Sequence, residues 1–391
     1  MEQSGRLSER KEQGGGLSEL NTEHAPFLLH PSGKDYLWGG HRLKDDFSKE
    51  LGLDPLAETW ECSTHPDGPS TVRSGPFAGR LLTEVLKEHP DFIGTHPAAC
   101  GGLPILVKFI DARNDLSVQV HPTDEYAREH ENGSLGKTEM WYVVEAAKGA
   151  RLVYGFRHDM TREDLLHALE TETLGRHLQV VPVQKGDVFF IPAGQVHAIG
   201  AGCLVAEVQE SSNLTYRLYD YNRVDRSGRK RALHIDKALD VVNYRGSAQP
   251  RQPAKVIRFR NGLMIESLCH CKYFQVEKVT VDTQRCRELA WFKTRANSFR
   301  VLLCLEGCGV LSWGGGRQAD SADLVDGGSR IGSTGSRGNG GSRVDGGSRI
   351  GSGSQSGGGQ FNFFRGDCIF VPADSVDYCI HGSAVMLRVS C

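Results

Sequence analysis

The 391-residue sequence predicts a mainly β fold, built from many short strands that form a barrel or a sandwich. Two observations support this prediction. Short apolar runs alternate with Gly- and Pro-containing turns along most of the chain. In addition, two stretches are near-copies, since residues 186–197 read GDVFFIPAGQVH and residues 366–377 read GDCIFVPADSVD. A duplicated β unit indicates two related halves.

One histidine distinguishes the two copies. Both begin with Gly-Asp and share a central Pro-Ala, but His197 of the first copy corresponds to Asp377 of the second. An imidazole is a common metal ligand. The difference suggests a metal site that is kept in the first half and lost in the second.

The elements expected before residue 251 mix strands with a few helices. Residues 55–60 lead into a polar loop, 61–68, and residues 79–93 have the apolar spacing of a helix. Further helices are expected at 162–176 and 234–242. The expected strands are 103–110, 116–121, 140–144, 152–156, 178–183, 187–191, 203–208 and 214–221.

The remaining sequence is again typical of strands and contains one long interruption. The expected strands are 254–259, 263–268, 273–281, 299–305, 308–313, 361–364, 367–371 and 384–389. Residues 314–360 are rich in Gly, Ser and Arg and carry VDGGSRIGS twice, at 325–333 and 344–352. Only one Val and one Ile recur in each unit, which favours a flexible loop over a solenoid. We therefore expect a disordered tail at 1–24, a first domain at 25–250 and a second at 251–391.

Composition and charge exclude several classes of protein. Lys and Arg total 46 against 48 Asp and Glu, a net charge of −2, so a nucleic-acid partner is not expected. The polar N-terminus does not resemble a signal peptide, and no apolar run has membrane-spanning length. The eleven scattered cysteines are interpreted as reduced thiols. Cys269-His270-Cys271 and the pair Cys304 and Cys308 could bind metal, but their apolar, strand-like surroundings favour buried thiols. A cytoplasmic protein is predicted, either a monomer or a weak homo-oligomer.

A group of potential metal ligands comes from three separate β segments. In Ser117-Val118-Gln119-Val120-His121 the polar residues share one strand face, and Glu139 and His197 lie beside other strands. Each residue also has an interpretation without metal: the polar face of 117–121 and Glu139 could be solvated, and His197 could be a structural histidine. Together, neutral imidazole and carboxylate are typical of a Lewis-acid zinc site, and an amide oxygen is an acceptable fourth ligand.

Three cations accompany this group. Lys108 interrupts the apolar run 105–110, Lys137 lies two residues before Glu139, and Arg217 lies in the strand-like run 214–221. A surface position or a structural ion pair is the alternative for each, and it is weakest for Lys108, because a buried lysine needs an adjacent anion. A metal ion with three cations suits a phosphorylated, oxygen-rich substrate.

The chain resembles the type I phosphomannose isomerase family, in its bacterial short form. The resemblance extends over residues 27–311 and resumes at 361. The motifs that carry it are YLWGG at 36–40, ETWECS at 58–63 with HP at 65–66 and GPS at 68–70, LPILVKFIDA at 103–112, LSVQVHP at 116–122, KTE at 137–139, the stretch 186–197 and TYRLYDY at 215–221.

The resemblance implies two cupin-type, jelly-roll β-barrels with an added helical portion, and metal in the first barrel alone. It implies one Zn²⁺ per chain held by Gln119, His121, Glu139 and His197. It also implies that Lys108 and Ser117 meet the substrate phosphate, and that Lys137 and Arg217 line the reacting end of the sugar. Because the short form often uses only His, Glu and His, Gln119 could instead lie behind the ligands.

The implied reaction is the reversible isomerisation of D-mannose 6-phosphate and D-fructose 6-phosphate through a cis-enediol. Zn²⁺ would polarise the carbonyl group. The base is left open among Lys137, a metal-bound water and His65, while Arg217 is better suited to stabilising charge. Three rival functions remain: a cupin that binds sugar without turnover, an iron-dependent dioxygenase on the same scaffold, and an isomerase of another phosphohexose.

Overall fold

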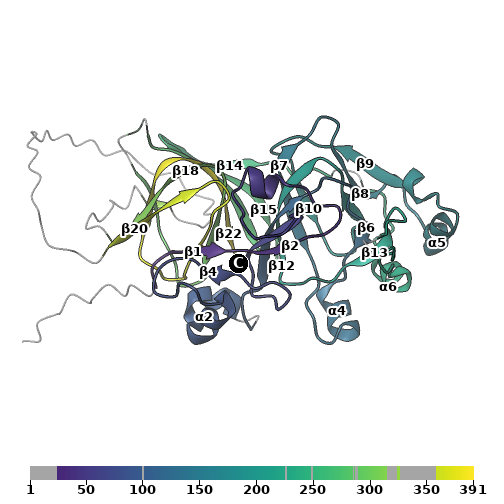
Figure 1. Ribbon diagram of the computed structural model, residues 1–391, viewed down its shortest axis with the longest axis horizontal. Helices are drawn as coiled ribbons and strands as arrows, with labels where there is room; N and C mark the ends of the chain where they lie inside the picture. The colour runs from purple at the N-terminus through teal and green to yellow at the C-terminus, as the bar shows by residue number, and fades with distance from the viewer. Residues whose placement is uncertain are drawn as a thin grey trace, which may run out of the picture.

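The computed structural model describes residues 24–98, 101–224, 227–247, 250–284, 286, 289–314, 324–325 and 358–391. Their strands form three sheets (Figure 1), so the predicted mainly β fold is confirmed. The finer prediction of two closed barrels is not confirmed, because none of these three sheets closes on itself along the described strands. The expected tail, apart from His24, and most of the expected insertion at 314–360 lie outside the described residues.

The first sheet collects the second half of the chain together with two N-terminal strands. It is antiparallel along its main path, as expected for strands joined by short turns. Its members are β14 (Lys255–Arg260), β15 (Leu263–His270), β16 (Gln275–Asp282), β22 (Tyr378–Ser390), β18 (Arg300–Trp313), β21 (Cys368–Val371), β1 (Phe27–His30) and β4 (Thr71–Val72), with β17 (Ala290–Phe292), β19 (Leu324–Val325) and β20 (Gly359–Phe364) attached at its sides.

The second and third sheets come from the first half. The second sheet has the order β10 (Val188–Ile191), β7 (Glu139–Ala146), β12 (Cys203–Glu210), β5 (Ile105–Asp111), β3 (Glu58–Cys62) and β2 (Ser32–Lys34). The third has the order β13 (Tyr216–Tyr219), β6 (Val118–Val120), β11 (His197–Ile199), β8 (Arg151–Phe156) and β9 (Leu178–Pro182).

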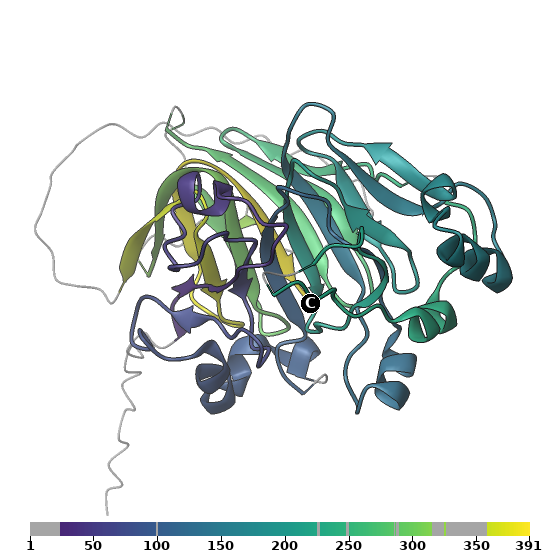
Figure 2. The same cartoon turned by 45° about the vertical axis from the view of Figure 1, so that its right-hand side comes forward.

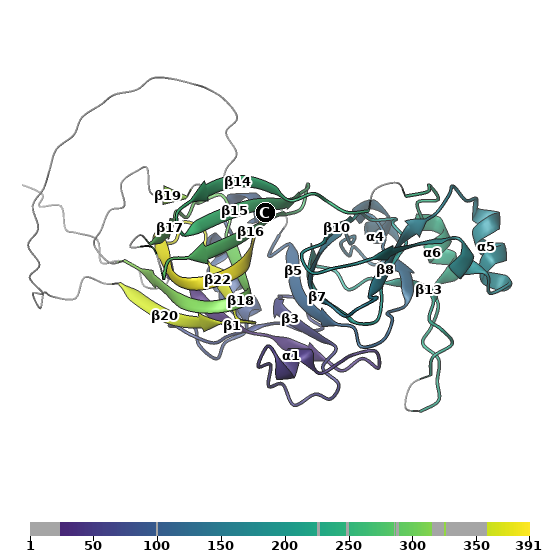
Figure 3. The same ribbon diagram turned by 90° about the horizontal axis from the view of Figure 1, so that it is seen from above.

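The central strands of the second sheet, β5, β7 and β12, are buried on both faces, which explains why they are mostly apolar. One face packs against the first sheet through residues such as Phe109 and Tyr142, which share a core with Val301 and Phe370. The other face packs against the third sheet, where Trp141, Val205, Leu152 and Ile199 belong to one cluster. From above (Figure 3), strands β3, β5, β7, β8, β10 and β13 of the second and third sheets lie to one side of β18 and β22.

Short helices cover the edges and outer face of these sheets. Helices α5 (Arg162–Glu170) and α6 (Ile235–Val241) lie on the outer side of the third sheet (Figure 2), where Leu165 and Leu239 join its core. The remaining helical segments are α1 (Arg42–Asp45), α2 (Leu82–Glu88), η2 (Pro90–Ile93), α3 (Thr95–Ala98), α4 (Asp124–His130) and η3 (Leu174–Arg176). Within the described residues, every helix is too short or too polar to cross a membrane.

The predicted helices are shorter than their apolar spacing suggested. The expected helix at 79–93 divides into α2 and η2, because Pro90 cannot continue an α-helix. The helix expected at 162–176 ends at Glu170, and Glu172 then adopts a left-handed backbone with φ of +56°. The loop expected at 61–68 begins too early, since Glu61 and Cys62 are buried members of β3.

The repeated sequence forms the same local structure in both halves. Gly186 and Gly366 both have φ of +91°, a value that favours glycine. The aspartate that follows each glycine accepts a hydrogen bond from a backbone amide three residues earlier, at 3.0 Å for Asp187 and 2.9 Å for Asp367. The duplication is therefore structural as well as sequential.

Candidate metal centre and polar cavity

Three predicted metal ligands meet between the second and third sheets. His121, Glu139 and His197 each offer one ligand atom, and these atoms lie within 4.8 Å of one another. Glu139 begins β7 of the second sheet, whereas His197 begins β11 and His121 directly follows β6 of the third. Among the described residues this is the one such group of His, Cys, Asp and Glu. The second half, where Asp377 replaces the histidine, has no counterpart in its described part.

The side chains of this cluster suit a divalent cation. All three residues are at most 1% exposed, and Nε2 of His197 and of His121 lie 3.4 Å and 3.6 Å from the Glu139 carboxylate. Neither carboxylate oxygen of Glu139 accepts a hydrogen bond of good geometry. Lys137 Nζ, 2.8 Å from Oε2, compensates part of this buried charge, whereas Oε1 has no donor and could face a further cation. The donor set therefore fits a metal ion.

The electrostatics of the cluster keep both imidazoles neutral. Burial, reinforced by Lys137 and the second histidine, holds the pKa of His121 well below its ordinary value, and burial lowers that of His197 to about 4. Burial and the adjacent Glu207 raise the pKa of Glu139 to about 7. Neutral imidazoles carry the lone pairs that metal binding requires.

Gln119 lies beside the cluster but presents its amide nitrogen to it. Its Nε2 atom is 3.3 Å from Nε2 of His197, while its Oε1 accepts a hydrogen bond from Ser117. The two strands bring these residues together directly, since Gln119 is paired with His197 across β6 and β11. Gln119 could become an oxygen ligand only if its amide group turned over.

A polar cavity of about 120 Å³ adjoins the cluster and brings the predicted cations together. Lys108, Lys137 and Arg217 all line it, as do Ser117 and Gln119. Lys137 Nζ lies 2.8 Å from Glu139 Oε2 and 3.2 Å from His121 Nε2. Burial alone would lower the pKa of Lys137, but Glu139 and Glu207 outweigh burial and raise it.

Lys108 is held between two carboxylates that the sequence analysis did not identify. Its Nζ atom lies 3.5 Å from Glu207 Oε1 and 3.7 Å from Glu58 Oε2, and 4.8 Å from the centre of the Trp60 ring. Glu207 is fixed in turn by the Trp141 indole, which donates to its Oε2 at 2.8 Å. Glu207 interrupts the apolar run 203–208, the same signal that had identified Lys108.

Arg217 is the cavity cation that lacks such a partner. Within the described residues it makes no ion pair, and its Nε atom is buried without a hydrogen bond. Burial and the nearby Arg231 lower its pKa. Arg231 also lines the cavity, but it is bound to Asp220. An anionic substrate group would therefore find an uncompensated positive charge at Arg217.

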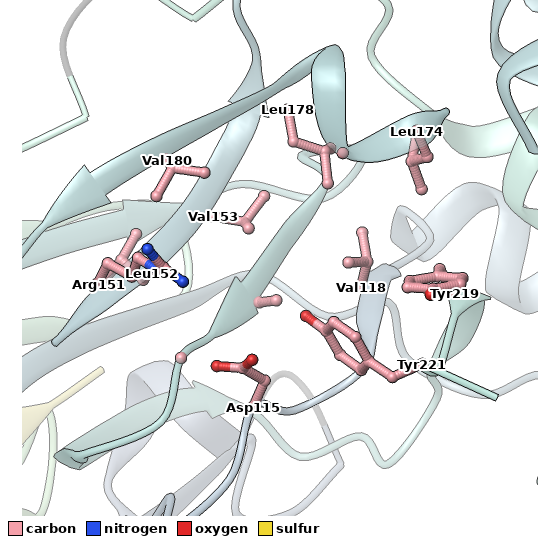
Figure 4. A pocket seen from close by; sticks show the side chains of 13 residues that line it. Asp115, Val118, Arg151, Leu152, Val153, Leu174, Leu178, Val180, Tyr219 and Tyr221 are labelled. Carbon is pink, nitrogen blue, oxygen red and sulfur yellow. The ribbon is translucent and has the colours of Figure 1, made fainter. Parts of the chain in front are cut away.

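A larger cavity of about 360 Å³ lies on the opposite face of the third sheet (Figure 4). Val118 and Ala198 line it, whereas their sequence neighbours Gln119 and His197 belong to the metal site. Side chains alternate between the two faces of a strand. The two cavities are thus separated by strands β6 and β11.

Fold and site together define a β protein that encloses a His–Glu–His metal-binding cluster and a cationic cavity between two sheets. The model of the phosphomannose isomerase type I catalytic domain matches residues 27–152. Mannose-6-phosphate isomerase ManA of Bacillus subtilis is 39% identical over 253 residues, which cover 65% of this chain and 78% of the relative. The Streptococcus mutans mannose-6-phosphate isomerase is 42% identical over 217 residues, or 56% of this chain and 67% of that protein.

The structural comparison agrees. The crystal structure of the Bacillus subtilis mannose 6-phosphate isomerase has a TM-score of 0.75 and 28% identity, covering 93% of this chain and 99% of that one. The chain therefore belongs to the type I phosphomannose isomerase family of enzymes, and the predicted resemblance is confirmed.

Proposed function

We propose that this protein catalyses the reversible isomerisation of D-mannose 6-phosphate and D-fructose 6-phosphate with one bound zinc ion. The single observation that carries the proposal is the buried His121–Glu139–His197 cluster beside a cavity that contains Lys137 and Arg217. A protein that only bound sugar would have no need for buried acid–base groups next to a metal site. The relatives named above are mannose-6-phosphate isomerases, which supports the same substrate.

Zinc is the metal we propose, because two neutral imidazoles and one carboxylate are a typical catalytic zinc set. Gln119 would complete the set if its amide turned over, with Ser117 Oγ then accepting from the amide nitrogen that now faces His197. The bound ion would polarise the sugar carbonyl and stabilise the negative charge that develops on the enediolate oxygen. An iron-dependent dioxygenase would use a similar ligand set, but the relatives support the isomerase.

Lys137 is the residue we propose for proton transfer between C2 and C1. It is buried and faces the metal cluster, with Nζ 2.8 Å from Glu139 Oε2. Glu139 and Glu207 raise its pKa, and the positive charge of a bound metal ion would lower it toward the range that a base needs. His65, the alternative from the sequence, is not among the residues that line the 120 Å³ cavity, and its ring packs edge-on to Trp60. Arg217 remains protonated and would stabilise the oxygen that becomes negatively charged.

The substrate phosphate is proposed to bind at Ser117 and Lys108, while Arg217 serves the reacting end of the sugar. Glu58 and Glu207 already balance the charge of Lys108. A phosphate beside Lys108 would therefore gain a hydrogen bond but little net attraction.

A second proposal concerns the fold: the second and third sheets, packed face to face around the site, would form the cupin-type jelly roll of the family.

The test is a coupled assay of mannose 6-phosphate isomerisation with metal analysis of the same purified sample. We expect about one zinc per chain, turnover of mannose 6-phosphate well above that of glucose 6-phosphate, and loss of activity with a chelator that zinc restores. Binding of mannose 6-phosphate without turnover at full zinc occupancy would instead establish a sugar-binding protein. Oxygen consumption by an iron-loaded sample would establish the dioxygenase.

A further inference from the structure

The segment that carries Lys137 and Glu139 is held from behind by one buried glutamate. Lys137 and Glu139 point into the site, and Thr138 between them points away from it. The amide of Thr138 donates to Glu210 Oε1 at 2.7 Å, and its carbonyl oxygen accepts from the amide of Glu210 at 3.1 Å. Glu210 thus binds both backbone polar groups of the residue between two site residues.

The neighbouring residues of the segment are fixed as closely. Asp124, the first residue of α4, accepts a hydrogen bond from the Gly136 amide at 2.9 Å. A Cβ atom at position 136 would lie 2.5 Å from the backbone nitrogen of Asp124, so the approach requires glycine. The Lys137 amide donates to the oxygen of Pro122 at 3.0 Å, and Ser212 Oγ donates to the oxygen of Leu135 at 3.0 Å.

The two carboxyl groups that hold the segment also contact each other. Glu210 is 2% exposed and shares a side-chain hydrogen bond with Asp124, so one of the two carries a proton. Burial and Asp124 raise the pKa of Glu210 to about 8, whereas the pKa of Asp124 is lowered. Burial alone would raise the pKa of Asp124, but the Gly136 amide and Glu210 outweigh it. Glu210 is therefore the donor and Asp124 the acceptor.

The second half of the chain completes this arrangement. The Tyr273 side chain, in the turn between β15 and β16, is hydrogen-bonded to Asp124, and Lys272 Nζ lies 3.8 Å from the same carboxylate. Tyr273 also packs against the core shared by the first and second sheets. The second half of the chain thereby reaches the back of the metal site.

We propose that Asp124 and Glu210 are a positioning pair that fixes residues 135–138 and so aims Lys137 and Glu139 at the metal and the substrate, with Tyr273 orienting the pair. The inference rests on the proposed function for its catalytic consequence, because misplacement of a reacting group by about 1 Å costs on the order of 100-fold in rate. Its structural consequence is independent: Glu139 should hold a metal less tightly when the pair is broken.

The test compares Glu210→Gln with Glu210→Ala. Glutamine keeps the hydrogen-bonding pattern of a protonated glutamate. Its side-chain oxygen can accept from the Thr138 amide, and its side-chain nitrogen can donate to the Asp124 carboxylate. We expect Glu210→Gln to stay within about 3-fold of the unmodified protein. We expect Glu210→Ala to lower kcat and zinc affinity each by about 10- to 100-fold, the usual effect of removing a group that supports a metal ligand. KM should change little.

Zinc affinity, measured by competition with a chelating dye, separates this proposal from the proposed function. If the unmodified protein binds zinc but does not turn over mannose 6-phosphate, the proposed function fails, while the affinity ratio of the two variants still tests positioning. Equal damage in Glu210→Gln and Glu210→Ala, or none in either, would overturn the positioning pair. Glu170→Ala, at the exposed end of α5, is the matched control and should alter neither quantity.

Two further variants keep the test decisive if Glu210→Ala does not fold. Asp124→Asn can still accept from the Gly136 amide, but it leaves the Glu210 proton without a charged acceptor, and it should weaken zinc binding and kcat together. Tyr273→Phe removes only a hydroxyl group and should produce a smaller loss in the same direction. Unchanged zinc affinity and kcat in both folded variants would overturn the proposal.

Discussion

The Nδ1 atom of His197 lies 2.8 Å from the backbone oxygen of Gln195, so this imidazole donates from Nδ1 and keeps a lone pair on Nε2. That lone pair faces Glu139 Oε1 at 3.4 Å. A backbone carbonyl that fixes the tautomer of a histidine is a common support for a metal ligand. The ring is thus already oriented for metal binding by the main chain of the turn that precedes β11.

Removal of the His197 imidazole should therefore abolish metal binding and isomerisation together. We expect His197→Ala to bind less than a tenth of the zinc of the unmodified protein, and to lose activity in proportion, as seen by metal analysis and the coupled assay. Circular dichroism would show whether the sheets are intact. Full turnover by a zinc-free His197→Ala protein would exclude the cluster as the catalytic metal site.

Lys137 should behave in the opposite way to the histidine. Lys137→Met removes a cation 2.8 Å from the carboxylate that a metal would use. Coulomb repulsion between Lys137 and the metal would be lost, so zinc affinity should be unchanged or higher, while kcat should fall by at least about 100-fold if Lys137 transfers the proton. Activity near that of the unmodified protein would remove Lys137 from the chemistry, and the base would have to be sought elsewhere.

Arg217 should affect turnover without affecting the metal. It carries the uncompensated positive charge in the cavity and lies across from Gln119 in the pairing of β13 with β6. We expect Arg217→Ala to lower kcat/KM by about 100-fold or more at unchanged zinc content, because a charged group that stabilises a transition state contributes about 3 kcal/mol. Loss of zinc with retained turnover per bound zinc would make Arg217 a structural residue.

Lys108 has a structural role that complicates its predicted contact with phosphate. Lys108→Met would leave Glu58 and Glu207 buried without their cation and should destabilise the protein by about 3 kcal/mol. Lys108→Arg keeps the charge and should cost less. If Lys108 also binds phosphate, KM for mannose 6-phosphate should rise in both variants. An unchanged KM in Lys108→Arg, with urea unfolding as the stability measure, would leave only the ion-pair role.

The sequence predicted the grouping of the candidate ligands better than it predicted the residues around them. The alternation of polar and apolar residues along 117–121 and the repeated turn before His197 are local signals. Both features are present in the structure. Three of the four candidate ligands, His121, Glu139 and His197, lie together in the structure. The carboxylates that pair with Lys108, Glu58 and Glu207, are far from it in sequence, so no local pattern assigns them to this lysine. Glu61, expected in a loop, is instead a buried strand residue 2.7 Å from Lys49.

The same limit explains why Glu210 was not predicted. A glutamate at the end of a strand is usually solvated, and its role emerges only when β12 pairs with β7 and brings Glu210 beside Thr138. The sequence also could not show whether the sheets close into barrels, because closure depends on which sheet edges pair and not on the strands themselves. Apolar alternation predicts strands and gives no information about sheet edges.

The raised pKa of Glu210 makes a stability prediction with a definite sign. Its folded pKa of about 8 exceeds the ordinary glutamate value, so the folded state binds the proton more tightly than the unfolded chain does. The stabilisation from Glu210 is complete at acidic pH and is lost as pH rises through about 8. Above this pH, Glu210 and Asp124 both carry negative charge, and Lys272 at 3.8 Å and the Tyr273 hydroxyl compensate only in part.

Glu210→Gln cannot ionise, so its free energy of unfolding should fall less between pH 5 and pH 9 than that of the unmodified protein. Urea unfolding at each pH measures both slopes, and their difference isolates Glu210, because every other titrating group is common to the two proteins. Parallel pH profiles would show that Glu210 is ionised throughout this range. No proton would then be shared between Asp124 and Glu210. The Thr138 amide would donate to a charged Glu210 carboxylate, which a neutral glutamine should not replace well.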